Sequence, residues 1–149
     1  MLRGIATVNL YIDDPAAAAG WYAELLGIEP YYSRPGPDGR PAYVEFRIGD
    51  RLQELGFISR AYAPAGSDAA GVKRVPGGPV VHWHVDELDD AIERLRGLGA
   101  VEYLPKTEHG PGFVTASFVD PFGNLLGVMT NTHYLETLGE GAPRSAAGV

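Results

Sequence analysis

The sequence predicts an α+β fold built from two βαβββ modules. Residues 7–32 and 80–100 follow one plan, in which an alternating strand leads through a polar turn into a helix that ends at glycine. A pair of strand-like runs around a turn signal follows each of them, at 42–59 and 112–129. A module this short buries little apolar surface alone, so two must pair, within one chain or between chains.

The first module is predicted over residues 5–58. Its opening strand, "TVNLYI", alternates, and the helix after it begins where Asp14 has the chemistry of an N-cap and Pro15 that of a first helical residue. Gly27 suits the left-handed position at which a helix ends. The segment "AYVEFRIGDRLQELGFIS" then reads as two strands around Gly49 and Asp50.

The second module is predicted over residues 80–130. It runs through the strand "VVHWHV", the turn "DEL" and the helix "DDAIERLRGL", which stops at Gly99, and its last two strands flank the turn "DPFGN". Residues 59–79 are rich in Gly, Pro and Ala and are predicted to be a linker. We expect one domain over residues 1–137 and a disordered tail over 138–149. His109 is expected in a loop, and His133 in the tail segment that follows the last strand.

Composition excludes several classes of protein. The chain has 149 residues, 45% hydrophobic and 21% charged, which are globular values. It has no cysteine, so disulfides, thiolate catalysis and thiolate metal sites are excluded, and a cytoplasmic location is expected. The net charge of −7 argues against a nucleic-acid partner and suits a cationic or neutral small molecule. No apolar run approaches the ~20 residues that span a bilayer, and no signal peptide is recognisable, so no membrane association is expected.

The stretches "IDDPAAAAGWYAELLG" and "VDPFGNLLGV", with the paired βαβββ plan, resemble the glyoxalase, bleomycin-resistance and extradiol-dioxygenase superfamily, also called vicinal oxygen chelate proteins. The resemblance covers roughly residues 5–130. It implies cupped, partly open mixed sheets with helices on the outside, a ligand site on the concave face, and a two-fold homodimer. Because one fold supports many chemistries, the resemblance indicates the fold more strongly than the function.

The resemblance also implies a divalent metal whose ligands stand at matching places in both modules. Three of those places fall on Thr7, Val80 and Gly127, and the fourth falls on Glu54 or Gly56, depending on how the strands are aligned. Threonine, valine and glycine side chains do not supply the donor set that divalent metals need. We therefore expect neither a metal nor another cofactor.

Strand alternation predicts which side chains line the cup. Apolar faces must pack under the helices, which leaves the polar faces to the cup. On the middle strand of the first module this places Tyr43, Glu45 and Arg47 in the cup, with a solvated or internally ion-paired Glu45–Arg47 face as the alternative to a ligand role. In "FVTASFV" the pattern leaves the facing of Thr115, Ser117 and Phe118 open. The predicted ligand-binding residues are Asn9, Tyr11, Tyr43, Arg47, Glu54, His82 and His84.

Three interpretations of His82 and His84 stay open. The two histidines either fill a polar sheet face through hydrogen bonds, or contact a ligand, or form a displaced metal site with Glu54. The function we expect is small-molecule binding without a metal, similar to the antibiotic-sequestering, bleomycin-resistance-like members of the family. The alternative is a glyoxalase-like lyase, isomerase or dioxygenase with His82 or Glu54 as general base, or with relocated metal ligands. A purely structural dimer module is a third class, disfavoured by the polar concave face.

Overall fold

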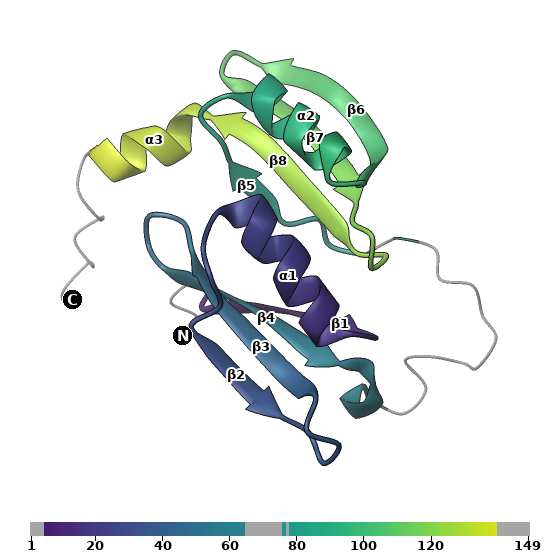
Figure 1. Cartoon of the computed structure of the whole chain (residues 1–149). Coiled ribbons are helices and arrows are strands. Elements are labelled where there is room, and N and C mark those ends of the chain that lie inside the picture. The colour runs from purple at the N-terminus through teal and green to yellow at the C-terminus, as the bar shows by residue number, and fades with distance from the viewer. Residues whose placement is uncertain (1–4, 65–75, 77, 140–149) are drawn as a thin grey trace. The chain divides into compact units, whose positions relative to one another are not determined.

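Each of the two sequence repeats folds into its own four-stranded mixed sheet with a helix on one face (Figure 1). The structure, a computed structural model, describes residues 5–64, 76 and 78–139, and it divides the chain into two compact units, residues 1–74 and 75–149. The prediction of an α+β fold with two βαβββ modules is thereby confirmed. The two units are described one at a time below.

The first unit contains one sheet, one α-helix and a short 3-10 helix. In chain order the elements are β1 (Thr7–Ile12), α1 (Pro15–Leu26), β2 (Tyr32–Pro35), β3 (Pro41–Ile48), β4 (Gln53–Ser59) and η1 (Arg60–Tyr62). The strand order is β1-β4-β3-β2, with β1 parallel to β4 and the other pairs antiparallel. The parallel pair is possible because α1 carries the chain across the sheet between β1 and the rest of the unit.

Helix α1 begins and ends where the sequence predicted. The Asp14 carboxylate accepts hydrogen bonds from the backbone N–H groups of Ala16 and Ala17, each at 3.1 Å, and Pro15 is the first helical residue. At the other end Gly27 has φ 69°, and its N–H donates to the Ala23 carbonyl at 2.9 Å. These local signals fix both ends of the helix.

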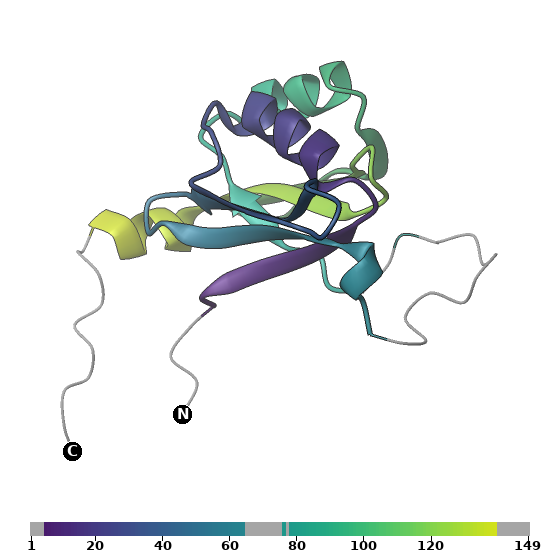
Figure 2. The same cartoon turned by 60° about the horizontal axis from the view of Figure 1, so that its bottom comes forward.

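The core of the first unit lies between α1 and one face of the sheet (Figure 2). Tyr22 on the helix is 1% exposed, and its ring centroid lies 4.6 Å from that of Phe57 on β4. Val44 and Phe46 on β3 are likewise buried, and so is Leu55 on β4. Burial of each such side chain contributes about 1.5–3 kcal/mol. Since strand residues alternate between faces, the other face carries the polar side chains.

The second unit repeats the plan and adds a helix. Its elements are β5 (His82–His84), α2 (Leu88–Gly97), β6 (Val101–Gly110), β7 (Phe113–Val119), β8 (Leu125–Asn131) and α3 (Thr132–Gly139), and the strand order is β5-β8-β7-β6. Strand β5 is shorter than the predicted "VVHWHV". Gly99, with φ 87°, follows α2 as expected.

The register of β7 and β8 decides a facing that the sequence left open. Ser117 is paired with Gly127, which is paired in turn with His82, so Thr115 and Ser117 share the face of His82. Phe118 points to the opposite face and is fully buried. The buried carboxylate of Asp120 accepts from the backbone N–H groups of Phe122 and Asn124 at 2.9 and 2.8 Å, which confirms "DPFGN" as a turn.

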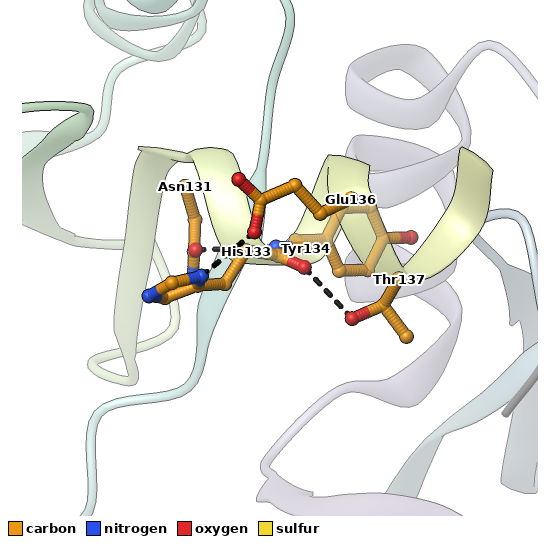
Figure 3. A network of polar contacts seen from close by, with 5 residues as sticks. All are labelled: Asn131, His133, Tyr134, Glu136 and Thr137. Atoms are coloured by element: carbon orange, nitrogen blue, oxygen red, sulfur yellow. Dashed lines mark hydrogen bonds and ion pairs between the residues drawn. The ribbon is translucent and has the colours of Figure 1, made fainter. Parts of the chain in front are cut away.

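Helix α3 was not predicted. Figure 3 shows that Asn131 caps it, since its side-chain oxygen accepts from the Tyr134 N–H at 3.2 Å. His133 lies in this helix, not in a tail, and its ring contacts the Glu136 carboxylate at 2.9 Å. His109 likewise lies in β6 instead of a loop. Of the predicted tail, Leu138 and Gly139 complete α3, and residues 140–149 lie outside the described residues.

No helix within the described ranges is long and apolar enough to cross a membrane.

Candidate functional site

The face of the first sheet that points away from α1 consists of three cross-strand rows. The register gives them as Thr7–Glu54–Arg47, Asn9–Gly56–Glu45–Tyr32 and Tyr11–Ile58–Tyr43–Arg34. Tyr43, Glu45 and Arg47 therefore share one face, as alternation along β3 indicated. The rows contain five of the predicted residues, namely Asn9, Tyr11, Tyr43, Arg47 and Glu54, and they add Glu45 at the centre.

Glu45 is the hub of a hydrogen-bond network. The residue is 7% exposed, and the hydroxyls of Tyr31 and Tyr43 each donate to one of its two carboxylate oxygens. The Tyr31 hydroxyl also lies 3.3 Å from a carboxylate oxygen of Glu54, and the Tyr43 hydroxyl lies 3.5 Å from the side-chain oxygen of Asn9. Two phenols thus satisfy a carboxylate that burial would otherwise leave without partners.

Arg47 contacts this network through a ring instead of through an ion pair. Its guanidinium carbon lies 4.1 Å from the centroid of the Tyr31 ring, a cation–π contact. Within the described ranges no carboxylate lies within 4.0 Å of the Arg47 side chain, so the predicted alternative of a Glu45–Arg47 ion pair is not formed. Arg47 acts on the carboxylate at longer range.

The environment changes the acidity of two groups in the network. Burial raises the pKa of the Glu45 carboxyl, the nearby Glu54 charge raises it further, and the Arg47 charge opposes both. Burial also raises the pKa of the Tyr43 hydroxyl, with smaller contributions from Glu54 and Tyr32. Tyr43 is therefore a neutral phenol at physiological pH, and Glu45 holds its proton to a higher pH than an ordinary glutamate does.

Gly56 makes room for the network. A Cβ atom at this position would lie 2.1 Å from the Asn9 side-chain oxygen and 2.6 Å from the Tyr43 hydroxyl, far inside van der Waals contact. Gly127 has the equivalent place in the second unit, where a Cβ would lie 2.6 Å from the nearest atom of the His82 ring. In both units a glycine, on β4 or on β8, thus leaves room for a neighbouring polar side chain to lie over its Cα atom.

A cavity of about 450 Å³ adjoins the network on the same face. Its floor is the row Arg34–Tyr43–Ile58, so Tyr43 belongs to both features: its hydroxyl bonds to Glu45, and its side chain lines the cavity. The complete lining is Arg34, Pro35, Gly36, Pro37, Ala42, Tyr43, Ile58 and Tyr62. The volume lies within the ~300–1,000 Å³ of typical small-molecule sites.

Two sets of local polar contacts position the walls of the cavity. The turn between β2 and β3 is closed by a hydrogen bond from the Gly36 N–H to the Arg40 carbonyl at 2.7 Å, which places the prolines of this hairpin. On the other side Arg60 anchors η1 to β1, because its guanidinium contacts the Asp13 carboxylate at 2.7 Å and the Tyr11 carbonyl at 2.6 Å. The anchored η1 ends at Tyr62.

The two histidines of the second unit have different surroundings. The His84 Nδ1 accepts a hydrogen bond from the Asn131 N–H at 3.1 Å, and its ring stacks on Tyr134 at 5.0 Å between centroids. These contacts agree with the interpretation of His84 as a hydrogen-bonded filler that holds the start of α3. His82 is exposed and lies over Gly127, where it is accessible to solvent.

The residues at the metal places implied by the resemblance do not fit a metal. Thr7 lies directly opposite Glu54 in the register, whereas Gly56 lies opposite Asn9 and Gly127 opposite His82. Neither unit places a second carboxylate or a histidine at those positions, and one carboxylate does not complete a coordination sphere. Among the described residues, no group of three or more His, Asp or Glu side chains is arranged to hold a metal ion.

Sequence reasoning did not place Tyr31, Arg34 and Tyr62 in the site. Tyr31 and Tyr62 lie outside the strands, where periodicity gives no facing, and the short β2 was not delimited in advance. The available signal was the pair of adjacent tyrosines, Tyr31 and Tyr32, at the start of β2.

Comparison with known proteins identifies relatives of the whole described fold. The family model described as Glyoxalase/Bleomycin resistance protein/Dioxygenase superfamily matches residues 4–128. A glyoxalase-related enzyme from Fulvimarina pelagi is 20% identical with a TM-score of 0.65, and the match covers 88% of this chain and 90% of that one. A superfamily member from Sphaerobacter thermophilus DSM 20745 is 17% identical with a TM-score of 0.64, covering 86% and 97%.

A lactoylglutathione lyase from Agrobacterium tumefaciens is 21% identical with a TM-score of 0.60, covering 85% of this chain and 92% of that one. At these identities the structural likeness shows the fold alone. No curated protein matches the chain.

Proposed function

The chain belongs to the Glyoxalase/Bleomycin resistance protein/Dioxygenase superfamily, and from this premise we propose that it binds a small molecule in the cavity of its first sheet without a divalent metal. The observation that carries the proposal is a cavity of about 450 Å³ whose floor residue Tyr43 is anchored to a buried carboxylate. A wall held in place before the ligand arrives lowers the entropy cost of binding.

The chemistry of the lining supports sequestration over turnover. Its side chains are prolines, an isoleucine, an alanine, two tyrosines and one arginine, which offer flat apolar area and one charge. They include no carboxylate, histidine or serine, which are the commonest general bases and nucleophiles, and the hydroxyl of the lining residue Tyr43 already donates to Glu45. Binding with a few polar anchors is what such a surface does well, and antibiotic sequestration is the role we propose for it.

Metal independence follows from the donor atoms near the cavity. The two carboxylates of the first sheet face are Glu45 and Glu54, and Glu45 already accepts from two phenols. These two bonds occupy one acceptor site on each Glu45 oxygen, and Glu54 is the one other carboxylate in the rows of this face, so the face lacks the several donors that a divalent cation needs. The ligand is therefore proposed to bind the protein directly.

A fluorescence titration tests the proposal. N-phenyl-1-naphthylamine, a neutral aromatic probe, is titrated into the EDTA-dialysed full chain, its Tyr62→Ala variant and its Tyr103→Ala variant. Tyr62 and Tyr103 are 55% and 43% exposed, and only Tyr62 lines the cavity. We expect saturable binding that Tyr62→Ala weakens about two- to tenfold, the worth of one aromatic contact, and that Tyr103→Ala leaves unchanged.

Two outcomes would contradict the proposal. One is binding that appears only after zinc or manganese is added back. The other is equal affinity of the two tyrosine variants for the probe, which would mean that the probe binds outside the cavity.

A second candidate function rests on Glu45 itself. A buried carboxyl with a raised pKa, hydrogen-bonded to two phenols, has the properties of a general acid–base group. The Agrobacterium neighbour that is called a lactoylglutathione lyase makes isomerisation of the methylglyoxal–glutathione adduct the reaction to test. The enzyme proposal requires that EDTA-dialysed protein forms lactoylglutathione and that Glu45→Gln abolishes this. If no product forms above the uncatalysed rate, this candidate reaction is rejected.

A further inference from the structure

We propose that the ligand of the cavity is an aromatic compound that carries an anionic oxygen group, with Arg34 as the counter-ion. This proposal rests on the proposed binding function and adds the chemical class of the ligand. It follows from three features of the cavity: one unpaired cation on its floor, flat apolar walls, and carboxylates that lie outside its lining.

Arg34 is the one charged side chain among the lining residues. It is exposed on β2 directly opposite Tyr43 in the register, so it stands at the edge of the floor. Within the described ranges no carboxylate lies within 4.0 Å of its guanidinium, so its donors are available to a ligand. A guanidinium pairs with two oxygens of a carboxylate, sulfonate or phosphate at once, which favours an oxyanion over a single polar atom.

The walls favour a ring system over a flexible chain. The Tyr43 hydroxyl is turned toward Glu45 and Asn9, so the tyrosine offers its ring to the cavity and not its hydroxyl. Tyr62 adds a second aromatic ring, and Pro35 and Ile58 add rigid and branched apolar surface. Aromatic and apolar walls of this kind pack against flat rings. The cavity volume of about 450 Å³ accommodates more than one ring.

The local charge of the cavity is opposite to the charge of the whole chain. The net charge of −7 favoured a cationic or neutral ligand at the level of sequence. The charge of exposed groups is screened over about 8 Å at physiological salt, however, so the nearest groups decide what the cavity accepts. Two carboxylates adjoin the lining without belonging to it. Glu45 lies behind the Tyr43 floor and is a weak acid because burial raises its pKa, and Asp38 in the hairpin turn accepts a hydrogen bond from the Arg40 N–H at 3.0 Å.

Two probes that share one aromatic frame separate the anion from the rings. 8-Anilinonaphthalene-1-sulfonate carries a sulfonate, and N-phenyl-1-naphthylamine lacks it. Both are titrated into the full chain and into Arg34→Gln and Arg40→Gln. Arg40 is the matched control, since it is an exposed arginine of the same hairpin and does not line the cavity.

We expect the wild-type chain to bind the sulfonate more tightly than the neutral probe. Arg34→Gln is expected to weaken sulfonate binding about five- to tenfold, the contribution of one partly solvated charge-assisted pair, and to weaken binding of the neutral probe much less, because the substitution removes the charge and keeps part of the side chain's apolar contact. Arg40→Gln should bind both probes as the wild type does. Added sodium chloride should weaken the sulfonate complex of the wild type and not that of Arg34→Gln.

The possible failures point to different errors. If the neutral probe binds as tightly as the sulfonate and Arg34→Gln changes neither, the ligand class is wrong while the binding site survives. Equal losses in Arg34→Gln and Arg40→Gln would mean that general positive charge attracts the sulfonate, which also overturns the role of Arg34. If neither probe binds in a manner sensitive to Tyr62→Ala, the proposed function itself fails.

Discussion

Replacing Gly56 by alanine tests whether the polar network is a built part of the site. The added Cβ would lie 2.1 Å from the Asn9 oxygen, 2.6 Å from the Tyr43 hydroxyl and 2.8 Å from the Tyr43 Cε2. Asn9 is exposed and can turn away, but Tyr43 is held by its bond to buried Glu45. The methyl group therefore displaces Tyr43 and breaks that bond.

The expected cost follows from the groups that must move. Overpacking of a fixed site costs about 1–3 kcal/mol, and loss of a hydrogen bond to a charged partner costs about 1.5–3 kcal/mol, in part the same energy. We expect the free energy of unfolding of Gly56→Ala to fall by about 2–3 kcal/mol and its affinity for N-phenyl-1-naphthylamine to fall with it.

Gly127→Ala is the matched control. The three atoms nearest to its Cβ all belong to the ring of exposed His82, which can turn into solvent, so a loss below about 1 kcal/mol is expected. The assay is urea denaturation followed by tryptophan fluorescence and circular dichroism, with probe titration of each variant. Equal stability of the two variants, or unchanged probe affinity in Gly56→Ala, would refute the view that Gly56 exists to seat Tyr43.

Three further expectations concern other groups. Burial raises the pKa of Glu45 in the folded state, so this carboxyl favours folding most below the ordinary glutamate pKa, and the contribution is lost as pH rises through the raised value. Glu45→Gln should therefore flatten the fall in the free energy of unfolding above about pH 4. An unchanged pH profile of stability would contradict the burial argument. His84→Phe keeps the stacking on Tyr134 but loses the acceptor for the Asn131 N–H, so hydrogen exchange of that amide should accelerate about two- to tenfold. The control variant His82→Ala should leave this exchange rate unchanged. Equal rates in the two variants would mean that His84 does not support the start of α3. Light scattering at micromolar concentration should give the mass of a two-fold homodimer, the commonest assembly among soluble homo-oligomers. A monomer mass would contradict this expectation.

The fold was predictable because local signals and periodicity agree along most of the chain. Asp14, Pro15 and Gly27 fix α1 through capping that needs no tertiary information, and alternation on β3 placed Glu45 on the polar face. Helix α3 was missed because its cap, Asn131, is itself the last residue of β8, so no turn separates the strand from the helix.

The site was predictable only where strands carry it. Tyr31 and Tyr62 come from connections, and their positions depend on bonds to Glu45 and on the anchoring of η1 by Arg60, neither of which has a sequence period. The role of His84 depends on Asn131, which is distant in the chain. Cavities depend on what a tertiary fold leaves unfilled, so the lining formed by Arg34 and the hairpin prolines could not be read from composition.

The most direct test of the central claim is a crystal structure of the EDTA-dialysed full chain soaked with 8-anilinonaphthalene-1-sulfonate. Difference density for the fused rings over the row Arg34–Tyr43–Ile58, with the sulfonate at the Arg34 guanidinium and no anomalous metal peak on either sheet, is the result expected here. Density for the probe elsewhere with this cavity filled by solvent, or a metal peak ringed by protein side chains beside the probe, would contradict metal-independent binding at the first sheet.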